Sequence, residues 1–159
     1  MTLNDLLLEK LANWRPAAKE RATLAVTDEK SGCMAALTAD RCDDLSCLVW
    51  ELTIRRPRTD GTPPLTDRAR LLAEHVTGLL EPLKVVEVDA ARDEAILRSD
   101  EPTYRSDDLF YYELRLKGNE EATLRRFQGA TPTGRRQQIS FALTHEALAK
   151  IAQDLTAEK

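Results

Sequence analysis

Apolar residues recur at helical spacing in three stretches of the chain, and each stretch predicts a helix. One lies at the start, one follows the proline-rich segment 55–66, and one closes the sequence. Thr2, Thr66 and Thr144 stand at the expected N-caps, where a side-chain oxygen can accept a hydrogen bond from a free backbone N–H. The three apolar stripes consist of Leu3, Leu7, Leu11 and Trp14; of Ala69, Leu72, Val76, Leu79 and Leu80; and of Leu148, Ile151, Ala152 and Leu155.

Alternation of apolar and polar residues predicts strands in most of the remaining chain. The clearest strand is 47–56, where Leu48, Trp50, Leu52 and Ile54 share one face. This pattern is typical of an antiparallel strand that is buried on one side only. Seven further strands are predicted, at residues 23–27, 33–39, 83–88, 95–97, 109–117, 121–128 and 135–143.

The register of one hairpin can be derived from its side chains. A three-residue loop at 118–120 places Leu114 opposite Leu124 and Glu113 opposite Arg125, and both pairs are favourable across two strands. A two-residue loop would set apolar side chains against polar ones. We therefore expect the three-residue loop.

Helices that bracket runs of strands, without strict alternation, predict an α+β fold with a largely antiparallel sheet. We expect three helices and about 7–8 strands in the order α-βββ-α-βββββ-α. The loop 55–66 contains three prolines and a glycine and is a possible internal subdivision. Because about 56 residues before it would form only a marginal core, we expect one domain over residues 1–159.

Composition places the chain among folded proteins and argues against two classes of partner. The chain has 159 residues, of which 42% are hydrophobic and 31% charged. The formal net charge of −4 argues against a nucleic-acid-binding protein. No apolar run approaches the roughly 18 residues that span a bilayer, so we expect no membrane partner.

The cysteines and the first residues favour a cytoplasmic location. Leu residues near the start are interrupted by Asp5, Glu9 and Lys10, unlike the apolar stretch of a signal peptide. Cys33, Cys42 and Cys47 form an odd set. An odd set without a secretion signal is typical of free thiols in a reducing compartment.

Known catalytic and metal-binding patterns are missing from the sequence. None of the six glycines belongs to a phosphate-binding loop pattern, and no C-x2-C pair marks a zinc site. His75 and His145 are the only histidines. We interpret both as ordinary helix residues near the surface, because His145 stands at the solvated start of a helix and His75 lies off the apolar stripe. We expect no catalytic residue, metal or cofactor.

Charge is distributed unevenly in the second half of the chain. Residues 81–121 hold six basic and twelve acidic residues, whereas residues 122–159 hold six basic and three acidic ones. Four arginines gather around the loop 129–134, namely Arg125, Arg126, Arg135 and Arg136. They could bind an anion or a partner, because guanidinium groups recognise phosphate and carboxylate. The alternative is that they neutralise the acidic segment within the same sheet.

We expect a non-enzymatic binding module that acts on a protein or peptide partner. The alternative is a small enzyme or ligand-binding domain that uses the arginine cluster on an anionic ligand. A pocket with perturbed carboxylates beside Arg125 or Arg135 would favour the enzyme. A shallow apolar groove or a two-fold interface would favour the module.

In size, acidity and order of elements, the chain resembles class I type III secretion chaperones. The resemblance is one of fold and composition, without a shared sequence motif. It implies a small acidic α+β homodimer that binds another protein.

Overall fold

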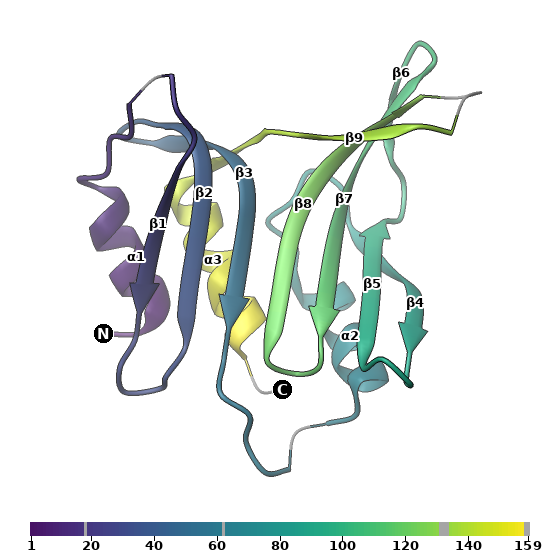
Figure 1. The fold of residues 1–159 in the computed structure, drawn as a ribbon, viewed down its shortest axis with the longest axis horizontal. Helices are drawn as coiled ribbons and strands as arrows, with labels where there is room; N and C mark the ends of the chain where they lie inside the picture. Colours follow the sequence, from purple (N-terminus) through teal and green to yellow (C-terminus); the bar gives the residue numbers. More distant parts are fainter. Residues whose placement is uncertain (18, 62, 131–133, 158–159) are drawn as a thin grey trace.

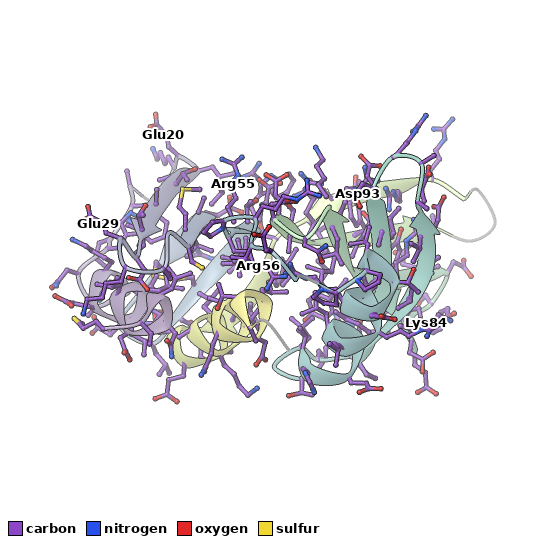
Figure 2. The ribbon with its side chains drawn as sticks, turned by 90° about the horizontal axis from the view of Figure 1, so that it is seen from below. Glu20, Glu29, Arg55, Arg56, Lys84 and Asp93 are labelled. Atoms are coloured by element: carbon purple, nitrogen blue, oxygen red, sulfur yellow. A yellow bond between two sulfur atoms is a disulfide. The ribbon has the colours of Figure 1, made fainter. Side chains whose placement is uncertain are left out.

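Three helices cover one face of a ten-stranded antiparallel sheet, which confirms the predicted α+β class (Figure 1). The computed structural model describes residues 1–17, 19–61, 63–130 and 134–157, and these counts refer to them. Figure 2 shows the helices side by side beneath the sheet, with Arg56 between the sheet and one of them. The sheet's opposite face carries no helix in the described part of the chain.

The helices are α1 (Leu3–Leu11), α2 (Leu65–His75) and α3 (His145–Thr156). The expected caps hold at two of them: Thr2 forms a capping box with Asp5, and Thr144 Oγ1 accepts from the Ala147 N–H at 3.0 Å. At α2 the prediction was wrong, because Pro64 occupies the N-cap position and the helix starts one residue before Thr66. Proline is tolerated there because its missing N–H would have no helical partner.

The strands are β1 (Ala22–Thr27), β2 (Met34–Cys42), β3 (Ser46–Arg55), β4 (Leu83–Asp89), β5 (Glu94–Ser99), β6 (Thr103–Arg105), β7 (Asp108–Lys117), β8 (Glu121–Ala130), β9 (Arg136–Ile139) and β10 (Phe141–Thr144). All eight predicted strands are present. Two more arise because β6 forms inside the expected polar loop, and because Ser140 divides the last predicted strand into β9 and β10.

Strand β3 joins the two halves of the sheet, whose order is β1-β2-β3-β8-β7-β5-β4. Its second half pairs with β8, from Leu52 opposite Leu124 to Arg55 opposite Glu121. Its first half pairs with β10 instead, while the far end of β8 pairs with β9. The halves therefore diverge at one end, where the segment of β9 and β10 crosses between them (Figure 1). The single domain over 1–159 stays a prediction.

The hairpin of β7 and β8 has the predicted register. Leu114 lies opposite Leu124 and Glu113 opposite Arg125, and Lys117 pairs with Glu121 across the three-residue loop. The apolar partners Leu114 and Leu124 are each 1% exposed, so side-chain burial selects this register over a one-residue shift.

A bulge in β3 corrects the prediction that Leu48, Trp50, Leu52 and Ile54 share a face. Leu52 and Ile54 point into the core, but the pairing with β2 skips Trp50, so Val49 is buried in the first half of the strand. An extra residue shifts the side-chain alternation by one. Trp50 therefore lies away from the helices, where the Arg21 guanidinium stacks 3.6 Å from its ring centre.

The core between the sheet and the helices is built mainly from leucines, with few aromatic side chains. Its largest fully buried members are Leu7, Leu11, Leu37, Leu52, Ile54, Leu97, Leu114, Leu116, Leu124, Leu148, Ile151 and Leu155.

Two buried arginines hold the end of α3 against the sheet. Arg68 donates to the carbonyls of Leu155 and Asn119, and Arg56 donates to those of Ala157 and Asn119. Cations suit the negative end of a helix. Burial, with the neighbouring charge of Arg56, lowers the pKa of Arg68 to about 10.

Candidate functional site

A groove of about 710 Å³ opens on the helix-covered side, where the two halves of the sheet diverge. One wall consists of the consecutive residues 139–144, which include β10, and the other of residues 78–80. Phe110, Tyr112 and Arg126 form the floor. The groove is mostly apolar with few polar groups, as is typical of binding sites.

Strand β10 offers its backbone to this groove. The N–H of His145 bonds to the Leu45 carbonyl at 2.9 Å, and this pair continues the register of β10 with β3. Hydrogen-bonded pairs alternate along antiparallel strands, so Leu143 and Phe141 bond to β3 and the backbone groups of Ala142 point away from it. Among the described residues, no hydrogen bond joins the backbone of Ala142 to another part of the chain. Its N–H and C=O form a free strand edge.

A buried ion pair builds the floor. Arg126 donates to both oxygens of Glu81, at 3.1 and 2.9 Å, and the two side chains are only 8% and 6% exposed. Ser99 and Thr103 donate to the same carboxylate at 2.7 and 2.6 Å. The segment that carries the groove wall 78–80 is thereby tied to the sheet.

The charges of the floor are balanced. Burial alone would raise the pKa of Glu81, but the hydrogen bonds from Arg126, Thr103 and Ser99 outweigh it and hold this pKa below its usual value. Burial raises the pKa of the Tyr112 phenol, which therefore stays neutral at pH 7. The Arg126 guanidinium lies 4.1 Å from the Tyr112 ring centre, and the Phe141 ring meets Tyr112 edge-on.

The wall 78–80 corrects the predicted extent of the second helix. The helix ends at His75, and Val76 is extended, so Leu79 and Leu80 do not continue the apolar stripe. Gly78 packs close to α3, where a Cβ would meet Ile151 at 3.4 Å. Leu80 is 75% exposed and lines the groove, so it is an apolar side chain available for contact.

The four predicted arginines do not converge on one point. Arg126 lies on the helix side, bound to Glu81, whereas Arg125 on the opposite face donates to Glu51 at 2.6 Å. Arg136 stacks over Phe127 and donates to Tyr111, and Arg135 has interactions of its own. Arg126 and Arg136 thus contact carboxylates of the acidic segment 81–121, as the neutralising alternative expects, whereas Arg125 contacts Glu51, which lies outside that segment. Their role in binding an anion or partner stays a prediction.

Glu113 is the acidic centre of the face without helices. It is 2% exposed and accepts from Arg98 at 3.2 Å and from Arg136 at 3.4 Å. Burial alone would lower the pKa of Arg136, but contacts with Tyr111 and Glu113 raise it. The predicted neighbour Arg125 lies opposite Glu113 in the register but takes Glu51 as its ion-pair partner.

The cysteines differ from the prediction of three free thiols. Cys42 and Cys47 form a disulfide, and Cys33 is a buried free thiol. The reason is the hairpin: Asp43 N–H bonds to the Ser46 carbonyl, so the next pair, Cys42 and Cys47, is a non-hydrogen-bonded pair with Cα atoms 4.0 Å apart. Side chains approach each other most closely at such pairs.

The histidines divide into one confirmed and one corrected prediction. His75 is exposed at the end of α2, as expected. His145, expected near the surface as a helix-start residue, is buried, and its Nε2 lies 3.4 Å from Cys42 Sγ. The position at the start of α3 was right, but β10 carries this helix end against the β2–β3 hairpin.

The sequence did not reveal the groove or the cysteine–histidine cluster. The available signals were Gly78 inside the second apolar stripe, which favours an early helix end, and the turn 43–46 between two cysteines. The groove itself depends on the split of the sheet. No pattern of apolar and polar residues along the chain predicts that split of the sheet.

Comparisons with protein-family models, with curated proteins and with solved structures gave no match for this chain. The structure therefore defines the protein by its fold class alone, which is α+β with an antiparallel sheet. Within the described ranges, no helix combines the length and the apolar character needed to cross a membrane.

Proposed function

We propose that the protein is a non-enzymatic module that binds an extended segment of a partner protein along the free edge of β10. The observation that carries the proposal is the outward backbone of Ala142, which forms part of the groove wall. An extended peptide can add to such an edge as a further strand, so that its main chain supplies affinity and its side chains supply specificity.

The groove defines the kind of segment that fits. Strand β10 has four residues and is about 13 Å long at the rise of a strand, which suits an added strand of about four residues. Alternate side chains of that segment would enter the groove and meet Leu79, Phe110 and Phe141. Arg105 lines the same groove beside Phe110 and favours an acidic residue in the segment.

Replacing Ala142 by proline tests the edge directly. Proline removes the N–H that points into the groove but spares the bonds to β3, and proline is tolerated at strand edges. The probe is a 10-residue peptide selected on the protein from a random display library and labelled with a fluorophore. We expect fluorescence anisotropy to show that Ala142→Pro weakens its binding at least tenfold.

The matched control is Ala25→Pro. Ala25 is exposed on β1, the outer edge of the sheet, and the Asp28–Cys33 bond sets a register in which its N–H also points outward. This variant should bind the probe like the unmodified protein. Failure to select any binding peptide, or equal weakening by both substitutions, contradicts the proposal.

The alternative to this proposal is a homodimer like that of the secretion chaperones, and a separate experiment tests it. Multi-angle light scattering at several protein concentrations gives the mass in solution. The chaperone-like alternative expects twice the 17.9 kDa of one chain. A mass of one chain at every concentration would exclude that alternative and leave the peptide-binding proposal unchanged.

We infer a cytoplasmic site of action, in which a reducing environment would hold Cys42 and Cys47 as thiols and the disulfide of the structure would form only on oxidation. The arginine cluster supports an anion-binding or enzymatic role less well, since Arg125, Arg126 and Arg136 already contact carboxylates.

A further inference from the structure

Two cysteines and one histidine form a compact buried cluster at the tip of the β2–β3 hairpin. The sulfur atoms of Cys42 and Cys47 and a ring nitrogen of His145 all lie within 4.8 Å of one another. The three residues are 9%, 2% and 8% exposed. They come from three elements, β2, β3 and the first turn of α3, so the fold itself assembles the cluster.

The chemistry and spacing of these groups suit a zinc ion. Two thiolates and an imidazole are zinc ligands, and a C-x4-C spacing lies at the long end of the usual range. Bond lengths of about 2.3 Å to sulfur and 2.0–2.1 Å to nitrogen place sulfur and nitrogen ligands of a tetrahedral ion about 3.6 Å apart. Cys42 Sγ and His145 Nε2 lie 3.4 Å apart.

A cavity gives the cluster access from outside. It has a volume of about 540 Å³ and is lined by both cysteines together with Arg15, Arg41 and Ala142. Two thiolates balance the charge of a divalent cation, so the nearby arginines do not oppose its binding. Three protein ligands and an open side are the arrangement of zinc sites that keep a fourth position for water or another ligand.

We propose that Cys42, Cys47 and His145 bind one Zn²⁺ when the two cysteines are reduced, and that oxidation to the Cys42–Cys47 disulfide releases the ion. The oxidant is a peroxide. The two thiolates lose two electrons and form the S–S bond, while hydrogen peroxide takes up these electrons and two protons to give two molecules of water. The disulfide in the structure is the oxidised form of this pair of cysteines. The proposal is independent of peptide binding at β10.

The test uses the full chain, reduced with a phosphine and then transferred to oxygen-free buffer. Titration with Co²⁺ reports the ligands, because thiolate coordination gives a charge-transfer band in the near ultraviolet and tetrahedral geometry gives intense visible bands. We expect one Co²⁺ per chain, displaced by Zn²⁺. One equivalent of hydrogen peroxide should abolish both bands, and renewed reduction should restore them.

Variants assign the ligands. Cys42→Ser and Cys47→Ser should each remove the charge-transfer band, or halve it and lower the affinity for Co²⁺ at least a hundredfold. His145→Gln should weaken Co²⁺ binding at least tenfold. The matched control is Cys33→Ser, which removes the other buried cysteine and should leave the titration unchanged. Circular dichroism confirms that each variant is folded.

Two results would overturn the proposal. One is a reduced, folded protein that shows no thiolate–cobalt band. The other is a band that survives in Cys42→Ser or Cys47→Ser at full strength, or that Cys33→Ser abolishes.

Discussion

Replacing Glu81 by alanine will lower the free energy of unfolding by about 3–5 kcal/mol, because it leaves the buried Arg126 guanidinium without its carboxylate. Ser99 and Thr103 also lose their acceptor. Urea unfolding at pH 7, followed by circular dichroism, measures the change. A loss below 1 kcal/mol would show that the pair is not buried as described.

The matched experiment replaces both partners of the pair. In Glu81→Leu/Arg126→Met, neither charge remains buried, and such replacements of ion pairs by apolar residues are often close to neutral. We therefore expect the double variant to be more stable than Glu81→Leu or Arg126→Met alone. If the two single losses simply add in the double variant, the side chains do not interact.

The same pair contributes to stability in a pH-dependent manner. The pKa of Glu81 is lower in the folded protein than in the unfolded chain, so its carboxylate stabilises the fold above the usual glutamate value of 4.5. This contribution is lost as the pH falls through the folded-state pKa. The stability difference between the unmodified protein and Glu81→Gln should therefore shrink as the pH is lowered below 4.5.

Replacing Leu124 by alanine will cost about 2–5 kcal/mol of unfolding free energy. Leu124 is 1% exposed and lies opposite Leu52 on one side and Leu114 on the other, where β3 and β8 join the two halves of the sheet. The loss combines the transfer of the removed methyl groups with the cavity that they leave. Urea unfolding measures it.

The control for Leu124→Ala uses Thr123, the residue before Leu124 in β8. Thr123 faces the side without helices, is half-buried and shares a hydroxyl contact of 3.2 Å with Thr53. Thr123→Ala removes this hydroxyl contact and one half-buried methyl group, for which we expect a loss of about 1 kcal/mol. Equal losses for Leu124→Ala and Thr123→Ala would contradict the assignment of the core to the helix-covered side.

The fold class could be predicted because side-chain burial leaves a periodic record in the sequence. The alternation in β7 and β8 was strong enough to fix the register, with Leu114 opposite Leu124. The prediction failed where the backbone interrupts the two-residue alternation of a strand. The bulge at Trp50 shifted the faces of β3, and Ser140 divided one predicted strand into two.

The candidate site was harder to predict because it depends on contacts between segments far apart in sequence. Arg126 belonged to the predicted cluster, yet its partner Glu81 is 45 residues away and comes from a segment predicted as helix. His145 meets Cys42 across 103 residues. Spacing along the chain carries no signal for either contact.

Amide exchange at Ala142 is the most direct test of peptide binding along β10. In the free protein, the Ala142 N–H points into the groove and should exchange rapidly, whereas the Leu143 N–H is bonded to β3 and should exchange slowly. With the selected peptide at saturation, hydrogen–deuterium exchange measured by NMR should slow at Ala142 at least tenfold. Unchanged exchange at Ala142 in the saturated complex would contradict the proposed function.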